Sequence, residues 1–370
     1  MIYTNLHMRI AIVWWWAAGM MAAAILAERE DISPNVVLFE KNSRLWAKVI
    51  ISGGGRCNVT TGIYKNKELL SYYTRWSGFV ADAMKQFWPK KVRRRFEEHG
   101  VPLKEEEDRR VFPVSDDGKD IVWAFLHVFN EHKVKIHFRE TVETIQKKVC
   151  SDWSCSQQYQ LTTDHKTYYF DKVVLTTGWN AYKHTWSTGD GYSFAESLWH
   201  TITPLWPSLN SFCTREKIFH ELSGISFFNA SLTVEDNRKK VSWPLLLTHF
   251  GISWPVTFAF ASQIAYETIT KEKPLVCFFK PDSDKDKKDR DDRLKDVMHS
   301  YSKKDIANTL AQVFPKRFAR AICDYCQVQD NKNTGSLTRG EREKLVFTLW
   351  NGIKLHLIQR KPWDEFVTAG

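Results

Sequence analysis

The residues whose spacing most clearly suggests chemistry are Gly19 and Glu40, a glycine and an acid 21 positions apart. In a dinucleotide-binding βαβ unit, a G-x-G-x-x-G turn lets helix amides hold a diphosphate, and an acid about 20 residues later binds a ribose. Gly19 stands at the third glycine position, while Trp14 and Trp16 occupy the first two. We expect a diphosphate-binding turn and a ribose-binding acid, formed by Trp14, Trp16, Ala17, Ala18, Gly19 and Glu40. An indole at either of the first two positions would fill the space that the phosphates need.

A second candidate is the glycine-rich loop SGGGRCN, residues 52–58. Backbone amides in such a loop form a concave nest suited to anions, although a plain turn is an equal alternative. The expected cofactor contacts are Lys41, Gly53, Gly54, Gly55, Arg56, Cys57 and Asn58. Three alternatives stay open: Arg56 pairs with a surface acid, Cys57 is packed rather than reactive, and Asn58 caps the loop.

A third group follows the β-branched run KVVLT at 172–176, which ends in Thr177 and Gly178. Parallel strands deliver ligand-binding residues at their carboxyl ends, so we expect Thr177 and Gly178 to lie near the cofactor. For acid–base work the candidate is His249, with His184 as second choice; a structural role is the alternative for a lone histidine.

The elements around these residues follow a strand–helix–strand order. Residues 10–13 predict a buried parallel strand, 17–29 its crossover helix, and 36–40 the next strand. Residues 134–138 predict a further strand and 159–170 part of an antiparallel meander. After Pro204 the pattern changes to short strand-like pieces, and residues 305–323 and 338–349 predict later helices. The sequence predicts an α/β fold with a Rossmann-like parallel sheet and a β-rich, barrel-like insert.

Composition narrows the function classes. The 370 residues are 43% hydrophobic and 26% charged, as in ordinary globular proteins. The net charge of +10 is spread among acids, and no nucleic-acid-binding signature occurs, so we expect no nucleic-acid partner. Seven cysteines indicate reduced thiols and a cytoplasmic location, and the isolated pair Cys323 and Cys326 favours neither metal binding nor redox work. We expect no metal.

Residues 10–27 carry no charge, which allows a marginal membrane segment as an alternative. Its tryptophans lie inside the run rather than at its ends, and a strand follows at the spacing of a βαβ unit. We therefore expect no membrane span.

One feature of the composition is anomalous. The chain has 17 glycines and 16 tryptophans. About 7% glycine is usual, so glycine is scarce and tryptophan is in excess.

Several segments resemble one family, the FAD-dependent oxidoreductases that include aminoacetone oxidase and a bile-acid dehydro-steroid reductase. They are EKNSRLWAKVIISGGGRCNVT, RRVFPVSD, TTGWNAYKHTWSTGDGYSFAESLWHTITPL, LLLTHFGISWP and FVTAG. The resemblance implies an FAD-binding Rossmann-like domain at 1–203, an inserted substrate domain at 204–354, and a return to the first domain at 355–370.

The resemblance also implies the activity. A flavin would exchange hydride with a small organic substrate, an amine, a ketone or an enone-like compound. Oxygen or NAD(P)H would be the electron partner, and Val142 would give main-chain contacts to adenine. The oligomeric state stays open.

The chain departs from the family pattern in one systematic way. Tryptophan stands where the family has glycine at positions 14, 15, 16, 46, 179, 186, 199, 206, 243 and 254. Random drift would place many residue types there, so the hypothesis is a gene that uses UGA for glycine, translated as if UGA meant tryptophan. Relatives also continue past VTAG, which predicts that this chain is truncated.

The competing interpretation is a non-enzyme. A degenerate Rossmann-like scaffold, tethered to a membrane through residues 10–27, would bind partners without flavin. If the indoles are real, FAD binding by this polypeptide is doubtful, because bulky rings replace the bare main chain that a diphosphate needs.

Overall fold

The computed structural model describes residues 8–14, 16–30, 35–43, 49–50, 52–148, 158–179, 188–235, 240–282, 287–361 and 367–369. The chain divides into two units, residues 1–204 and 205–370. Hydrophobic cores form within each unit.

A four-stranded parallel sheet organises the first unit, in the order β10-β1-β2-β6. These strands are β1 (Arg9–Val13), β2 (Asn35–Glu40), β6 (Lys135–Phe138) and β10 (Lys172–Leu175). The β1 and β2 runs are apolar almost throughout because helices or strands cover both faces of the sheet. Ile12 lies between Leu38 of β2 and Val174 of β10, so the predicted central strand is confirmed.

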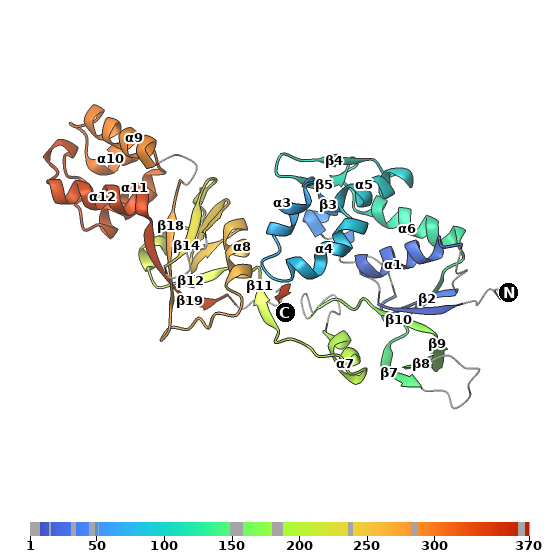
Figure 1. The fold of residues 1–370 in the computed structure, drawn as a ribbon. Helices are drawn as coiled ribbons and strands as arrows, with labels where there is room; N and C mark the ends of the chain where they lie inside the picture. The colour runs from blue at the N-terminus through green and yellow to red at the C-terminus, as the bar shows by residue number, and fades with distance from the viewer. Residues whose placement is uncertain are drawn as a thin grey trace. The chain divides into compact units, whose positions relative to one another are not determined.

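Two helices cover one face of this sheet and a small antiparallel sheet covers the other (Figure 1). The helices are α1 (Ala17–Ala27) and α6 (Lys119–Glu131), and the strands are β7 (Val142–Lys148), β8 (Gln158–Thr163) and β9 (Thr167–Phe170). Residues 10–27 are thus split between a strand and a short helix. Within the described ranges, no helix is long and apolar enough to span a membrane.

The remaining elements of the first unit are shorter. A three-stranded sheet in the order β3-β5-β4 lies among three helices, and η1 and α7 follow strands of the parallel sheet. Their bounds are η1 Ser52–Gly55, β3 Thr60–Thr61, α3 Asn66–Ser71, α4 Ser77–Gln86, α5 Pro89–Glu98, β4 Leu103–Glu105, β5 Arg110–Pro113 and α7 Asp190–Ser197.

An eight-stranded antiparallel sheet organises the second unit, in the order β13-β16-β17-β12-β19-β18-β14-β15. Its strands are β12 Phe212–Thr214, β13 Ser226–Phe227, β14 Ser231–Val234, β15 Lys240–Ser242, β16 Leu245–Thr248, β17 Gly251–Ser253, β18 Leu275–Lys280 and β19 Ile353–Arg360. A separate antiparallel pair joins β11 (Trp206–Ser208) to β20 (Val367–Ala369).

Helices pack on this sheet and share its core. Phe318 and Ile322 of α11 and Leu349 of α12 belong to the same buried cluster as strand residues Leu232 and Leu355. The bounds are η3 Lys217–Leu222, α8 Pro255–Gln263, α9 Lys287–Ser300, α10 Ile306–Leu310, α11 Lys316–Tyr325, η4 Thr334–Ser336 and α12 Arg339–Asn351.

The predicted fold class is confirmed: a Rossmann-type parallel sheet is followed by a β-rich region with helices. One detail differs. The single helix expected over 305–323 is two helices, because Pro315 lacks the amide hydrogen that a continuous helix needs at that point and instead precedes α11 as its N-cap. Residue 355, the expected start of a return to the first domain, lies within β19, and the domain boundaries stay a prediction.

Candidate functional site

The turn between β1 and α1 has the layout of a dinucleotide-binding turn. Trp16 is the N-cap of α1, and Ala17 and Ala18 are exposed in its first turn. Gly19 is buried where the helix crosses the strands. A Cβ on Gly19 would lie 2.6 Å from the carbonyl oxygen of Trp14 and 2.7 Å from Oγ1 of Thr176. Both distances are too short for real atoms, so glycine is required for this close helix–strand contact.

Trp14 occupies the position of the first glycine with a left-handed backbone, φ 70°. Its amide donates a hydrogen bond to the carbonyl of Phe39 at 2.9 Å, which joins the turn to the end of β2. The indole is 2% exposed, and its Nε1 has no hydrogen-bond partner among the described residues. The ring therefore fills the interior beside the turn instead of projecting into solvent.

Lys41 lies directly over this indole. Its Nζ is 3.6 Å from the ring centroid, a cation–π contact, and 3.3 Å from Oδ2 of Asp190. Nζ also donates to Oγ1 of Thr188 at 3.2 Å. Burial lowers the pKa of Lys41, while Asp190 and Glu40 act in the opposite direction. The predicted phosphate-binding cation is thus engaged with Trp14, Thr188 and Asp190.

Glu40 ends β2, where the ribose-binding acid was predicted, and its residue is 6% exposed. Its Oε1 accepts hydrogen bonds from the backbone amide and the side-chain Nδ2 of Asn42, both at 2.7 Å. These bonds orient the carboxylate within the turn that follows the strand. Ribose binding by Glu40 stays a prediction.

The glycine-rich loop begins with three left-handed residues, Gly53, Gly54 and Gly55, with φ of 60°, 74° and 95°. A Cβ on Gly53 would lie 2.7 Å from the ring of Phe112, whereas Gly54 and Gly55 face open space. The loop can therefore present main chain to a ligand at Gly54 and Gly55, which supports the predicted nest without testing it.

Cys57 closes the same loop, since its amide donates to the carbonyl of Ser52 at 2.9 Å. The residue is 6% exposed, and burial raises the pKa of its thiol. Both features favour the packed alternative over a reactive thiol. Asn58, the next residue, is exposed.

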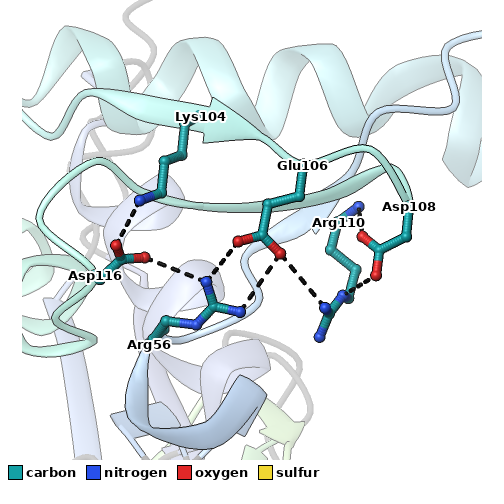
Figure 2. A network of polar contacts seen from close by, with 6 residues as sticks. All are labelled: Arg56, Lys104, Glu106, Asp108, Arg110 and Asp116. Carbon is teal, nitrogen blue, oxygen red and sulfur yellow. Dashed lines mark hydrogen bonds and ion pairs between the residues drawn. The ribbon is translucent and has the colours of Figure 1, made fainter.

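Arg56 takes part in a network of surface charges (Figure 2). Its guanidinium donates to Glu106 at 2.6 Å and to Asp116 at 3.3 Å, and lies 3.9 Å from the ring centroid of Phe112. Lys104 binds the other oxygen of Asp116, and this hydrogen bond is the main cause of the lowered pKa of Asp116. The structure thus favours the alternative in which Arg56 pairs with surface acids; a role in cofactor binding stays a prediction.

The carboxyl ends of β10 and β1 are joined by a residue that the sequence did not single out. Oγ1 of Thr176 lies 3.1 Å from the carbonyl oxygen of Val13 and 2.7 Å from that of Trp14. Thr177, the predicted site residue, is buried beside Gly191, and Gly178 follows with φ 70°. The end of β10 therefore reaches the β1–α1 turn through Thr176, and the predicted position of Thr177 and Gly178 near a cofactor stays a prediction.

Three functional candidates were thus missed: Thr176, Thr188 and Asp190. The polar run STGDG carried a signal, because a threonine and an acid there precede helix α7. Its pairing with Lys41 could not be foreseen, since the two segments are far apart in sequence.

Val142 begins β7 and is 2% exposed. It shares a buried cluster with Trp14 and Phe39, on the face of the parallel sheet covered by β7–β9. Its main-chain contact to adenine stays a prediction.

His249 lies in the second unit, in the turn between β16 and β17, where it is exposed. Its ring packs edge-on against Phe250, with centroids 5.0 Å apart. A catalytic role for His249 stays a prediction, and His184 lies outside the described residues.

A surface hollow of about 710 Å³ lies elsewhere in the first unit, between the end of α5 and helix α6. Its lining includes His99, Asp120, Trp123 and His127, and none of the predicted cofactor residues.

Dinucleotide binding can be tested against this geometry. The strand–turn–helix path, the close contact at Gly19 and the acid at Glu40 fit a diphosphate-containing dinucleotide. The indole of Trp14 does not, because it stacks under Lys41 where the first glycine should leave the backbone bare. The elements therefore fit an FAD-type cofactor, and one side chain of the turn opposes it.

This fold defines a protein with a Rossmann-type domain. Residues 8–362 match the family described as HI0933-like protein Rossmann domain. The chain belongs to this family, and its resemblance to FAD-dependent oxidoreductases is confirmed.

Two curated relatives give the family context. The chain is 23% identical over 338 residues to a 3-dehydro-bile acid delta(4,6)-reductase of Clostridium scindens, covering 88% of this chain and 77% of the relative. It is 23% identical over 315 residues to a ribosomal RNA dihydrouridine synthase of Escherichia coli K12, covering 85% and 73%.

Solved structures give weaker likenesses. A flavocytochrome c3 fumarate reductase has a TM-score of 0.36 at 15% identity, covering 60% of this chain and 47% of that one. A 3-ketosteroid-delta4-(5alpha)-dehydrogenase of Rhodococcus jostii RHA1 has a TM-score of 0.35 at 13% identity, covering 63% and 58%. Scores this low carry no argument about this chain.

Proposed function

We propose that the protein is an FAD-dependent oxidoreductase that exchanges hydride between the flavin and a small organic substrate. Two features of one strand–helix–strand segment support this proposal. Gly19 makes a close contact with the turn after β1, and Glu40 ends β2. Membership of the Rossmann family supports it. The flavin would supply the redox chemistry, and the protein would supply binding and orientation.

We further propose an enone-like substrate, a carbon–carbon double bond next to a carbonyl group. Two relatives of this chain are named as a delta(4,6)-reductase and as a dihydrouridine synthase. Both names describe saturation of a carbon–carbon double bond, which favours an enone over an amine. NAD(P)H would be the electron donor.

The remaining expectations about partners belong to the same proposal. The substrate would be a small molecule rather than a nucleic acid. Free thiols at Cys57, Cys277 and Cys323 support a reducing, cytoplasmic environment.

Flavin binding is the property to test first. We expect the chain with Trp14 and Trp16 to take up no FAD, because bulky residues stand at the first two glycine positions of the turn. The double variant Trp14→Gly, Trp16→Gly should bind FAD in a titration followed by flavin fluorescence. The matched control is Trp123→Gly, which removes an exposed indole from α6, away from the turn, and should take up no more FAD than the parent chain.

The bound flavin would then be tested for activity. It should be reduced by NAD(P)H and reoxidised by a cyclic enone in anaerobic stopped-flow measurements. A double variant that keeps the circular dichroism spectrum of the parent but binds no FAD would contradict the proposal and favour the non-enzymatic scaffold.

A further inference from the structure

The backbone places tryptophan where glycine is favoured. Eleven non-glycine residues have a positive φ among those that the structure describes, and four of them are Trp14, Trp76, Trp199 and Trp254. Tryptophan contributes only 16 of the 370 residues. Asparagine and aspartate tolerate positive φ best among residues with side chains, and a bulky aromatic residue there is an outlier. Four indoles in such positions are far more than composition predicts.

Trp254 is the strongest single case. Its φ of 79° and ψ of −176° lie in a region of backbone space that is essentially restricted to glycine. The residue precedes Pro255, which starts α8, and its side chain is 44% exposed. The backbone at this position favours a residue without a Cβ.

Trp199 and Trp76 repeat the pattern at helix ends. Trp199, with φ 70°, directly follows Leu198, the C-cap of α7, where a left-handed glycine commonly ends a helix. Its side chain is 93% exposed. Trp76, with φ 62° and ψ 13°, precedes α4 and is 55% exposed.

Helix starts give a second observation, which shares Trp76 and Trp254 with the first. Trp16, Trp76, Trp88 and Trp254 are the N-caps of α1, α4, α5 and α8, and none of them makes a side-chain capping bond. Indole nitrogen is a donor only, so it cannot accept a bond from the free amides of a helix start. Glycine, by contrast, is among the residues favoured at N-caps.

We infer that the natural protein carries glycine at positions 14, 76, 199 and 254, encoded by UGA codons that its organism reads as glycine. A codon reassignment explains why one residue type, and not a mixture, stands at backbone positions that need glycine. At position 14 the same change removes the buried indole beneath Lys41 and leaves bare main chain at the turn after β1. The inference does not depend on the proposed flavin chemistry.

The gene itself gives the first test. Codons 14, 76, 199 and 254 should be UGA, and the intact mass of the protein purified from its own organism should correspond to glycine at these positions. UGG codons at these positions would overturn the inference, whatever the protein does with flavin.

Thermal unfolding without FAD gives the second test. Trp199→Gly should raise the Tm of the chain by about 2–4 °C, the shift that relief of about 1 kcal/mol of strain produces in a unit of this size. Trp199→Ala should give no such gain, because alanine keeps the Cβ that a left-handed backbone disfavours.

The matched control is Trp123→Gly, which also removes an exposed indole but from the interior of α6. Glycine destabilises helix interiors, so this variant should lower the Tm. A Tm that rises equally in Trp199→Gly and Trp199→Ala, or rises in neither, would overturn the inference. Because no cofactor is present, failure here is distinguishable from failure to bind flavin.

Discussion

At the scale of single residues, the hydrogen that serves as the side chain of Gly19 sets the distance between a helix and a sheet. The carbonyl oxygen of Trp14 and the hydroxyl of Thr176 approach the place where a Cβ would stand, at 2.6 and 2.7 Å. One contact is main chain and the other is a short branched side chain whose single hydroxyl hydrogen is shared between the carbonyls of Val13 and Trp14. Displacing either the carbonyl oxygen or the hydroxyl would therefore cost folding free energy.

We therefore expect Gly19→Ala to destabilise the first unit by about 1–3 kcal/mol, the usual result of overpacking. Denaturant unfolding followed by circular dichroism measures the change. The control is Gly78→Ala in α4, where a Cβ would meet nothing within 4 Å. Because its backbone is helical, that variant should be stabilised by about 0.4–1 kcal/mol. Equal effects of the two substitutions would contradict the packing argument.

The residues of the site differ in how far the sequence predicted them. Gly19 and Glu40 lie within one continuous strand–helix–strand stretch, so their spacing alone placed them correctly in the fold. Thr176 and Asp190 come from distant segments and meet the turn through side-chain bonds that depend on tertiary packing. Arg56 is a case in which the sequence left two roles open: it pairs with Glu106 and Asp116, as one alternative expected, and its role in cofactor binding stays a prediction.

At the scale of elements, helix α12 shows how local sequence defines a boundary. Thr338 is the N-cap, and its hydroxyl accepts a bond from the amide of Glu341, while the Glu341 carboxylate accepts from the amide of Thr338. This reciprocal capping box satisfies two amides that the helix leaves free. Lys332 adds bonds of 2.7 and 2.8 Å to the same carboxylate.

These bonds predict a pH dependence. They lower the pKa of Glu341 from 4.5 to about 2, with Lys332 as the largest cause. A depressed pKa stabilises the fold fully above about pH 4.5, and this contribution is lost as the pH falls towards 2. The Tm difference between the parent chain and Glu341→Gln should therefore be constant above pH 5 and shrink between pH 4.5 and 2, as measured by thermal unfolding at each pH.

Lys332→Met provides the control, since it removes the largest cause of the lowered pKa. In that background the pH-dependent part of the Glu341→Gln effect should become smaller. A Tm difference that does not change with pH would contradict the assigned role of this carboxylate.

Helix prediction from the pattern of residues worked where caps and breakers are local. The helix expected over 338–349 is α12, Arg339–Asn351, and Thr338 is its N-cap. The segment predicted as helical over 305–323 contains Pro315. The helix does not continue through this proline, and the chain forms α10 and α11 instead.

At the scale of the whole molecule, each buried hydrophobic cluster is formed by residues from only one side of Pro204, where the chain divides into two units. The cluster of the second unit is built only from residues between 212 and 357, and the two clusters of the first unit lie between residues 11 and 194. Phe318 contributes to the former through ring contacts with Phe227 at 4.7 Å and Phe314 at 5.7 Å. The second unit therefore has a core of its own.

A fragment of residues 205–370 should consequently fold without the first unit. We expect a cooperative thermal transition and a circular dichroism spectrum with both strand and helix features. The control is Phe318→Ala in the same fragment, which should lower stability by about 3–5 kcal/mol because the ring is fully buried. A fragment without a cooperative transition would show that this core is not sufficient.

The fold class could be predicted from sequence because strand–helix–strand order and a later β-rich composition are visible in the order of residues. The strand order of the eight-stranded sheet could not, since β12 pairs with β17 and β19, partners separated from it by many other elements. Such pairings depend on long-range packing that periodicity does not encode.

The hydrogen of the Thr176 hydroxyl has a consequence for any ligand that occupies the turn after β1. It is shared between the carbonyls of Val13 and Trp14, and this contact holds both carbonyls in place before a ligand arrives. The conformational entropy of ordering this backbone is therefore lost during folding rather than during association. A ligand at this turn would meet a preorganised surface, and its affinity would reflect the side chains around the turn more than the flexibility of the main chain.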